Sequence, residues 1–407
     1  MRPSVLFLTH RIPYPPNKGD KIRSYHLLLE LSSHYDVHLG CFVDDPEDWQ
    51  YIEKIRPLCA SLLCLPVTRS RRYIKAALAF FRARPITLCL YGSHRLQRWV
   101  EKTVRQQSIK KILVFSGAMA QFVDAPHYQT SVRVIDFVDV DSDKWVQYAQ
   151  KKTGIARWVY QREHRLLQRY EQAITERFDK VLFVSATEAE LFRSLIPRSL
   201  ASRVDYLNNG VDSSYFDPQL VNGSLQAHST PFIVFTGAMD YWANEDAVTW
   251  FCGHVWPNLS KQHPELSFLI VGSNPTSAVK KLGEIEGVLV TGRVEDVRPY
   301  IKQALHVVAP LQIARGIQNK VLEAMAMAKT VVATRMAMEG IPLHAGLAVK
   351  IADSPEAFIQ ACDEALNNPQ QRDTQANRRW IQQQFNWKNT LETLHRLLEK
   401  PTPEEPG

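Results

Sequence analysis

The sequence lacks several features that would assign it to a simple class of protein. No apolar run approaches the roughly 20 residues of a membrane-spanning helix. The apolar run near the N-terminus, in MRPSVLFLTHRIPYPP, is too short for a signal peptide. The six cysteines form no C-x-x-C pair and no histidines stand at zinc spacing, so neither a disulfide framework nor a structural metal is expected. These absences predict a cytoplasmic protein.

The sequence also has no G-x-G-x-x-G fingerprint after an apolar strand, which argues against an NAD-dependent oxidoreductase. Its formal charge of +7 and pI near 9.0 suit anionic ligands, including nucleotide phosphates, anionic lipid headgroups and nucleic acid. No nucleic-acid-recognition module accompanies the basic residues. Nucleic acid is therefore not the expected partner.

A chain of 407 residues, 45% of them hydrophobic, is long enough for two domains that each bury a core. Strand-like apolar runs alternate with helical patterns in both halves, which predicts two parallel sheets covered by helices on both faces. The expected strands are Val5–Thr9, Val37–Phe42, Ser61–Leu65, Lys111–Phe115, Val132–Phe137 and Lys180–Val184, followed by Phe232–Thr236, Ser267–Val271, Val288–Thr291, His306–Ala309 and Thr330–Ala333.

Other segments are expected to connect or extend these two halves. Asp212–Pro231, with its Asn, Gly, Ser and Pro content, is the expected linker. A single basic helix is expected over Lys144–Lys180, and further helices over Arg372–Phe385 and Asn389–Leu398.

The most informative stretch runs from Ala309 to Thr334, where a strand end, a glycine-containing loop, a helix and another strand follow one another. Ligands of open α/β sheets gather at such strand ends. Gly316 would let the backbone approach an anion, and the N–H groups of the first helical turn suit a diphosphate. Lys320 would add a positive charge, and Glu323 on the same helix face could accept hydrogen bonds from ribose hydroxyls. The alternative is a surface ion pair between these two side chains.

Several strings resemble glycosyltransferase family 4. FIVFTGAMDYWANED at Phe232–Asp246, LIVGSNP at Leu269–Pro275 and VTGRVEDVRPY at Val290–Tyr300 resemble successive segments of that family's donor domain. Within that family, the sequence is most similar to the subgroup found with exosortase and exopolysaccharide gene clusters, the PEP-CTERM system. The strings that carry this similarity are RIPYPPNKGDKIRSYH at Arg11–His26, DFVDVDSDKW at Asp136–Trp145 and RGIQNKVLEAMAM at Arg315–Met327.

The resemblance implies an α/β protein with the GT-B fold, two facing Rossmann-like doubly wound domains with a C-terminal crossover helix. The implied parts are an acceptor-binding domain over 1–210, a nucleotide-sugar-binding domain over 211–385, a helix over 386–400 that returns to the first domain, and a tail over 401–407. The implied activity is transfer of a hexose, with retention of configuration, from a nucleoside diphosphate sugar to an acceptor hydroxyl. The acceptor would be a glycan or lipid-linked, in exopolysaccharide or other cell-surface glycan assembly, and neither a metal nor a cofactor is expected. The alternative is a non-catalytic protein that binds nucleotide sugar or nucleic acid.

The resemblance also implies a set of donor-binding residues. They are Gly19, Gly237, Arg293, Arg315, Gly316, Ile317, Lys320 and Glu323. Arg315 stands where many family members have a glutamate that faces the sugar. Because the basic residues common in the family's first donor turn are missing from GAMDYWANED, neutralising the diphosphate falls to Lys320, Arg315 and Arg293.

In the first domain, His10, Asp20 and Arg23 are expected on the acceptor side, with Gly19 close to the diphosphate or the transferred sugar. The alternatives are a structural role for His10 and an ordinary helix N-cap at Asp20.

An acidic run follows the strand Val132–Phe137. It contains Asp136, Asp139, Asp141 and Asp143. Like charges this close are not expected in a core, so something polar should meet them. Asp139 and Asp141 are expected to be catalytic, as are Lys320 and Glu323. The two aspartates would bind the acceptor or act as a general base. A D-x-D site for Mg²⁺ and solvated caps are the alternatives.

Residues 69–84, RSRRYIKAALAFFRAR, combine basic and apolar side chains. Such a helix can lie on an anionic membrane surface, which would place the protein peripherally on the inner face of the cytoplasmic membrane. The same composition fits a helix that packs on the sheet with a solvated basic face.

Overall fold

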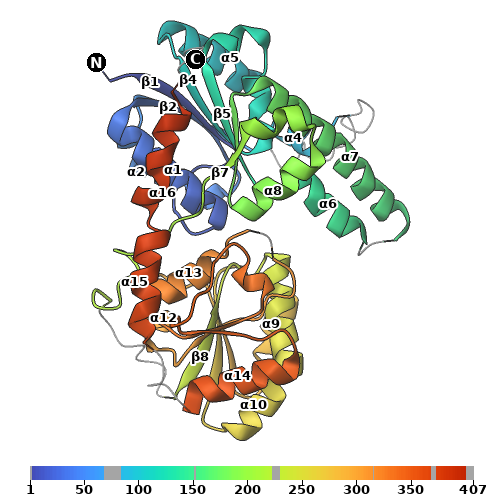
Figure 1. The fold of residues 1–407 in the computed structure, drawn as a ribbon, viewed down its shortest axis with the longest axis vertical. Coiled ribbons are helices and arrows are strands. Elements are labelled where there is room, and N and C mark those ends of the chain that lie inside the picture. The colour runs from blue at the N-terminus through green and yellow to red at the C-terminus, as the bar shows by residue number, and fades with distance from the viewer. Residues whose placement is uncertain are drawn as a thin grey trace, which may run out of the picture. The chain divides into compact units, whose positions relative to one another are not determined.

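The computed structural model describes residues 2–67, 84–150, 153–221, 230–314, 316–367 and 373–399. The chain divides into two compact units, one of Met1–Asn208 together with Leu391–Gly407 and one of Asn209–Thr390 (Figure 1). Each unit has its own parallel sheet. None of the described helices combines the length and the apolar character that a membrane crossing requires.

The sheet of the first unit has, in the described residues, seven parallel strands in the order β3-β2-β1-β4-β5-β6-β7. The strands are β1 (Ser4–Thr9), β2 (Asp36–Val43), β3 (Ser61–Pro66), β4 (Lys111–Phe115), β5 (Val132–Val138), β6 (Lys180–Phe183) and β7 (Val204–Tyr206). The central strand β1 is buried on both faces, and Val5 through Leu8 are each 0% exposed. A continuous apolar run is what such a strand requires.

Helices flank this sheet in the described part of the first unit. They are α1 (Gly19–His34), α2 (Ile52–Ile55), α4 (Ile86–Tyr91), α5 (His94–Gln106), α6 (Asp141–Gln150), α7 (Gly154–Arg177), α8 (Ala186–Leu195) and, from Leu391 onward, the C-terminal α16 (Trp387–Leu397). The single helix expected over Lys144–Lys180 is wrong, because α6 and α7 are separate and lie side by side (Figure 1). Gly154 starts α7 with φ of 60°, a conformation that suits glycine and breaks the run.

The sheet of the second unit has, where the structure describes it, six parallel strands in the order β10-β9-β8-β11-β12-β13. The strands are β8 (Phe232–Thr236), β9 (Ser267–Val271), β10 (Val288–Gly292), β11 (Val307–Ala309), β12 (Val331–Ala333) and β13 (Val349–Ile351). Both sheets therefore have the doubly wound order in which the chain starts at the centre and reverses direction once.

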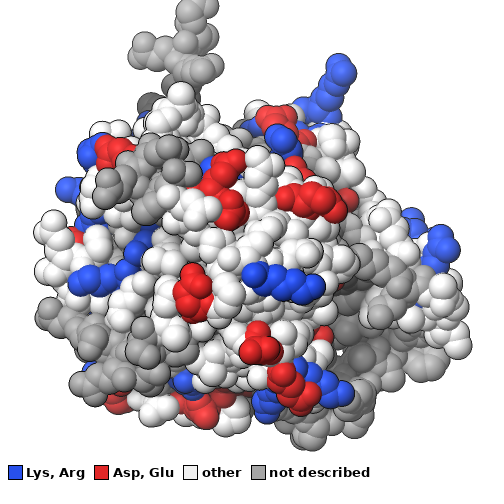
Figure 2. Space-filling model, turned by 90° about the horizontal axis from the view of Figure 1, so that it is seen from below, with Lys and Arg blue, Asp and Glu red and all other residues white. Residues whose placement is uncertain are grey.

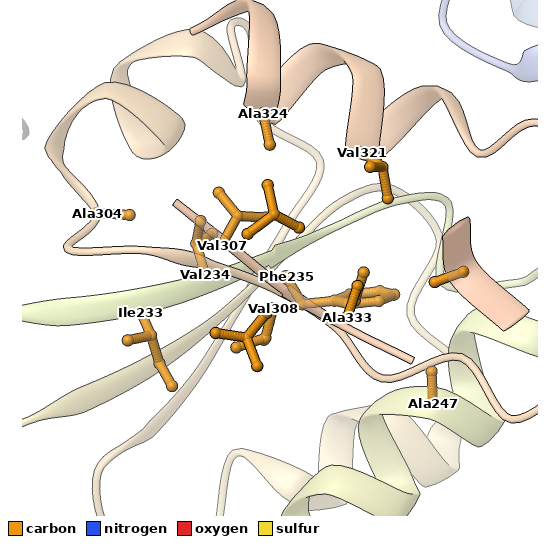
Figure 3. Close-up of a cluster of buried hydrophobic side chains, with 14 of the residues drawn as sticks. Ile233, Val234, Phe235, Ala247, Ala304, Val307, Val308, Val321, Ala324 and Ala333 are labelled. Atoms are coloured by element: carbon orange, nitrogen blue, oxygen red, sulfur yellow. The ribbon is translucent and has the colours of Figure 1, made fainter. Parts of the chain in front are cut away.

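Helices cover both faces of the second sheet. They are α9 (Trp242–His254), α10 (Trp256–Gln262), α11 (Ser277–Leu282), α12 (Arg298–Gln303), α13 (Asn319–Ala326), α14 (Pro355–Asn367) and α15 (Thr374–Gln384). In Figure 3, Val321 and Ala324 of α13 lie on one side of the strands and Ala247 of α9 lies on the other. All three are 0% exposed, so the sheet is the middle layer of a single core.

The segment expected as a linker, Asp212–Pro231, is not one in its described part. Val221 is buried in the core of the second unit. Arg378 of α15 donates hydrogen bonds to the carbonyl oxygen of Phe216 and, at 2.7 Å, to the carboxylate of Asp217. Residues 212–221 therefore belong to the second unit, which begins at Asn209.

Candidate functional site

Both sheets reverse their strand order at a central pair, β1 and β4 in the first unit and β8 and β11 in the second. Ligands of open α/β sheets bind outside the carboxyl ends of the strands at this point. In the second unit, the turns after β8 and β9 lie here together with the first turn of α13, as the following contacts show.

Two glycines make the close approach of these turns feasible. Gly237 follows β8, and its N–H donates a hydrogen bond to the carbonyl of Val271 at the end of β9. A Cβ on Gly272 would lie 1.6 Å from the carbonyl oxygen of Gly237. A Cβ on Gly237 would lie 2.7 Å from Nδ2 of Asn244 and 3.3 Å from Nζ of Lys320. A side chain at Gly272 would therefore displace the backbone, and one at Gly237 would displace the side chain of Asn244 and crowd the amine of Lys320.

Lys320 lies in the first turn of α13, which begins at Asn319. Its amine donates a hydrogen bond to Oδ1 of Asn244 and lies 4.3 Å from the ring centroid of Phe235. Asn244 in turn donates through Nδ2 to the carbonyl of Ala238, 2.8 Å away. Burial lowers the pKa of Lys320 to about 7, although the charge of Glu323 acts in the opposite direction.

Glu323 is half-buried on the same helix, and burial raises its pKa to about 7 against the opposing effect of Lys320. No ion pair within 4 Å joins these two described side chains, so they are not the surface ion pair that was the alternative. Both side chains are partly buried, and neither serves as a direct counter-ion for the other. Such a pair is a better fit to a ligand that supplies both an anion and hydroxyl groups than to a stabilising surface contact.

The loop before α13 supplies the remaining predicted donor residues of this segment. Gly316 has φ of 62°, the left-handed region that favours glycine, and Ile317 is buried. Arg315 lies outside the described residues. Asn209 donates a hydrogen bond of 3.1 Å to Oδ1 of Asn319, which ties the start of the second unit to the start of α13.

After β10, the predicted donor residue Arg293 is exposed. Its neighbour in this loop, Arg298, lies 3.7 Å from the ring centroid of Tyr215 and donates hydrogen bonds to Asp296. The sequence missed Tyr215 because it lies in the segment expected as a linker. It also missed Asn244, although that residue stands within the family-like string FIVFTGAMDYWANED.

A pocket of about 590 Å³ lies near these elements in the second unit. Leu311 after β11, Thr334 and Met336 after β12, and Asp353 after β13 are among the residues that line it. Neither Lys320 nor any other predicted donor residue of the described chain does so. This pocket therefore does not coincide with the predicted donor residues.

In the first unit, His10, Arg11 and Asp20 come together at the carboxyl end of β1. Nε2 of His10 lies 3.2 Å from Oδ2 of Asp20, and Arg11 donates a 2.8 Å hydrogen bond to the same oxygen. Burial acts to raise the pKa of Asp20, but the hydrogen bonds and charges of His10 and Arg11 outweigh it and lower that pKa. The N-cap of α1 is Lys18, so the alternative role of Asp20 as N-cap is wrong. Gly19 is the first residue of α1, next to this cluster.

Arg23 is expected on the acceptor side, and this expectation is wrong because the residue is buried and does not reach the surface of the protein. Arg23 and Asp136 are each 0% exposed, and Nε of Arg23 donates a 2.6 Å hydrogen bond to the carboxylate of Asp136. A second hydrogen bond of 2.7 Å goes to the carbonyl of Leu207. Arg23 and Asp136 therefore form an ion pair inside the first unit.

The two aspartates that the sequence favours for catalysis are partly exposed and share one cation. Nζ of Lys144 lies 2.7 Å from Asp139 and 3.3 Å from Asp141. The predicted polar partner of these carboxylates is thus a lysine three residues beyond Asp141. Val138, just before them, has φ of 74°, which is strained for a β-branched residue.

Two buried glutamates, which the sequence did not single out, accept hydrogen bonds from the backbone of the segment that contains Asp139 and Asp141. Glu188 accepts a 2.8 Å hydrogen bond from the backbone N–H of Val140, and Glu171 accepts one of 3.0 Å from that of Ser142. Burial raises the pKa of Glu171 to about 8, although the Ser142 hydrogen bonds act against it. Helical spacing marks both as ordinary helix-surface residues, so only the fold reveals their role.

The membrane contact expected for residues 69–84 falls almost wholly outside the described residues, which resume at Arg84.

Residues 230–368 match the family described as Glycosyl transferases group 1. The sequence matches no curated protein.

Solved structures share the fold over nearly the whole chain. A sucrose-phosphate synthase of Thermosynechococcus elongatus has a TM-score of 0.67 at 16% identity, covering 97% of this chain and 98% of that one. The HepE protein of Anabaena in complex with UDP has a TM-score of 0.67 at 14% identity, with 97% and 99% covered. A glycosyltransferase of Rickettsia africae has a TM-score of 0.64 at 13% identity, with 98% and 100% covered. The matched stretch of the second unit is thus similar to a glycosyltransferase domain, and the chain as a whole has the GT-B fold.

Proposed function

We propose that the protein transfers a hexose from a nucleoside diphosphate sugar to an acceptor hydroxyl, with retention of configuration. One observation carries the donor assignment. Lys320 is half-buried at the start of α13, and its amine lies beside Gly237, which has no side chain, at the point where the strand order of the sheet reverses. A diphosphate placed here would meet the amine, the N–H groups of the first helical turn and the positive end of the helix dipole.

The pKa values of the pair fit this role. A lysine whose pKa burial has lowered to about 7 lacks a strong counter-ion, and a diphosphate would supply one. The same charge would then stabilise the departing nucleoside diphosphate during transfer, without any rearrangement of solvent. Glu323 would accept hydrogen bonds from ribose hydroxyls. The leaving phosphate itself would take the acceptor's proton, so this step needs no protein base.

Finer parts of the proposal rest on the family-like strings. We place the protein near glycosyltransferase family 4 and its PEP-CTERM-associated subgroup, in assembly of exopolysaccharide or another cell-surface glycan. The acceptor would be a glycan or lipid-linked sugar on the side of His10, Asp20, Asp139 and Asp141, and residues 69–84 would contact the inner face of the cytoplasmic membrane. HepE has been solved in complex with UDP-glucose, which supports a nucleotide sugar as the donor here.

Nucleic acid is a poor alternative partner on the face of the protein in Figure 2. Lysine and arginine side chains there are interspersed with aspartate and glutamate and do not form a continuous basic stripe. A nucleic-acid-binding face would concentrate basic residues.

The donor assignment is tested by ligand-induced thermal stabilisation with a panel of UDP-, GDP- and ADP-sugars. A ligand at 100 times its dissociation constant should add about 2.7 kcal/mol to the free energy of unfolding. We expect one nucleotide sugar to stabilise the wild type, and Lys320→Met and Glu323→Gln to remove most of the shift.

Lys329→Met is the matched control, because burial also lowers the pKa of Lys329, to about 8, and its amine is bound to the carbonyl of Ala304. That variant should keep the full shift. If no nucleotide sugar stabilises the folded wild type, the donor assignment is wrong. Stabilisation without release of nucleoside diphosphate in the presence of glycan and lipid-linked acceptors would instead favour a non-catalytic binding protein.

A further inference from the structure

A cluster of metal-binding side chains lies in the first unit, away from the residues discussed above. Glu30 and His34 are one helical turn apart on α1, and His395 is on α16, in the part of that helix that belongs to the first unit. One potential ligand atom from each of the three lies within 4.8 Å of the other two. Their separation in sequence hides this arrangement from any search for local zinc spacing.

The individual distances show how little these atoms would have to move to share an ion. Nε2 of His395 lies 2.7 Å from Oε1 of Glu30, and Nδ1 of His34 lies 3.7 Å from the same oxygen. The two imidazole ring centroids are 4.2 Å apart. Ligands at about 2.0–2.1 Å from a tetrahedral ion are about 3.3 Å from one another, which falls between the two observed values.

We propose that Glu30, His34 and His395 bind a divalent transition-metal ion, with Zn²⁺ the best match, and that the ion links α1 to α16. Two imidazole nitrogens and one carboxylate oxygen form a donor set that zinc accepts readily, whereas Mg²⁺ and Ca²⁺ prefer oxygen ligands alone. Three protein ligands leave one position of a tetrahedron for water.

The surroundings allow an ion to enter and hold one ligand in orientation. The side chains of Glu30 and His395 are 22% and 24% exposed, and that of His34 is 55% exposed, so the cluster is open to solvent on one side. The hydroxyl of Tyr35 lies 3.4 Å from Nδ1 of His395, the ring nitrogen that is not directed at Glu30. Such a contact on the second nitrogen is the usual way in which a metal-binding histidine is oriented.

A simple ion pair between His395 and Glu30 explains only part of the arrangement. It accounts for the 2.7 Å contact, but it does not account for the third group. Nδ1 of His34 lies 3.7 Å from the same carboxylate oxygen, which is too long for a hydrogen bond, and its hydrogen-bond contacts are with the hydroxyl of Ser33 at 2.6 Å and the carbonyl of Glu30 at 3.3 Å. An ion shared by the three groups would replace these local contacts of His34. This inference does not depend on the proposed function.

The test uses the full chain, purified without a histidine tag and stripped of metal with a chelator. Zn²⁺ binding is measured by isothermal titration calorimetry, and Co²⁺ is used to report tetrahedral coordination by its visible absorption. We expect one ion per chain. Loss of a hydrogen bond to a metal ligand already weakens binding about 10–100-fold, so His34→Ala and Glu30→Gln, which remove or weaken a ligand, should each weaken it at least about tenfold.

His254→Ala is the matched control. His254 ends α9 as His34 ends α1, and its Nδ1 contacts the carbonyl of Trp250 as that of His34 contacts the carbonyl of Glu30. Trp250, however, offers no carboxylate. This variant should bind Zn²⁺ with the affinity of the wild type and keep the zinc-induced rise in melting temperature.

His395→Ala is expected to abolish tetrahedral Co²⁺ binding. Should it fail to fold, the more exposed His34→Ala still decides the question. Absence of stoichiometric binding, or equal affinity in the wild type and His34→Ala, would overturn the proposal, and so would binding that is lost only when cysteines are blocked.

Discussion

Single residues of this protein place ionisable groups in buried surroundings in three different ways. Arg23 and Asp136 neutralise each other inside the first unit. Lys320 is half-buried where we propose that a ligand binds. His306, just before β11, is 0% exposed, and neither of its ring nitrogens has a hydrogen-bond partner in the described structure. Each arrangement has a different measurable effect on stability.

His306 should make the second unit sensitive to acid. Burial, helped by the charges of His263 and nearby lysines, lowers its pKa to about 3, whereas the unfolded chain binds a proton there near pH 6.5. Between these values only the unfolded state takes up the proton, so the free energy of unfolding falls as the pH falls, by about 2 kcal/mol from pH 7 to pH 5.

We expect His306→Leu to lose less stability over this interval than the wild type in urea denaturation at the two pH values. His254→Leu, which changes an exposed histidine, should behave like the wild type. Equal acid sensitivity of His306→Leu and the wild type would contradict the prediction.

Arg23 should be important for stability and not for acceptor binding. Arg23→Met leaves Asp136 buried without its partner, which should lower the free energy of unfolding of the first unit by about 3–5 kcal/mol. Lys144→Met breaks the partly exposed pairs with Asp139 and Asp141 and should cost at most about 1 kcal/mol. Chemical denaturation of both variants checks this, and a smaller effect for Arg23→Met than for Lys144→Met would refute it.

At the scale of elements, the proposed donor site of the second unit depends on two turns that touch each other. Gly272→Ala would place a Cβ 1.6 Å from the carbonyl oxygen of Gly237, so the turns after β8 and β9 would have to separate. We expect this variant to lose both stability and nucleotide-sugar binding, as read from its melting temperature with and without ligand.

Gly253→Ala provides the comparison for Gly272→Ala. Gly253 lies in α9 with open space where a Cβ would go, and alanine is the better helix residue by roughly 0.5–1 kcal/mol. This variant should be as stable as the wild type or more so. Similar behaviour of the two variants would show that the contact between the turns is not required.

The elements that the sequence predicts well are those with a strong local signal. The bounds of β4, β8 and β9 agree with the expected strands, because each is a buried apolar run. The strands β7 (VDY) and β13 (VKI) escaped prediction, since three residues with a charged centre carry no such run. They form because the neighbouring strands β6 and β12 provide backbone groups for hydrogen bonding.

The candidate site shows the same division between local and distant signals. The glycine loop, Lys320 and Glu323 are adjacent in sequence, so the pattern places them on one helix. The contact of Lys320 with Asn244 and the pairing of Arg23 with Asp136 join residues far apart in the chain. No spacing rule finds such partners, because they depend on which strand lies beside which.

At the scale of the whole molecule, the first unit is completed by the last residues of the second half of the chain. Leu391, Leu394 and Leu398 are at most 2% exposed, and Nζ of Lys111 donates a 3.0 Å hydrogen bond to the carbonyl of Leu398. Burial of each such side chain contributes about 1.5–3 kcal/mol.

Truncation before Leu391 should therefore destabilise the first unit, although its seven described strands remain in the chain. We expect faster cleavage within residues 2–208 under limited proteolysis. Truncation after Glu399, which keeps all three leucines, should leave the cleavage rate unchanged. Equal protection of both truncated forms would show that α16 does not contribute to this unit.

The discontinuous first unit also has a consequence for synthesis on the ribosome. Roughly 180 residues of the second unit are made between Asn208 and the segment beginning at Leu391 that completes the first. At a synthesis rate of about 5–20 residues per second, the surface of the first unit that binds α16 stays uncovered for on the order of 10–40 s. During that interval the nascent chain exposes apolar surface that the finished protein hides, so chaperones have a longer opportunity to bind it than a contiguous domain would give them.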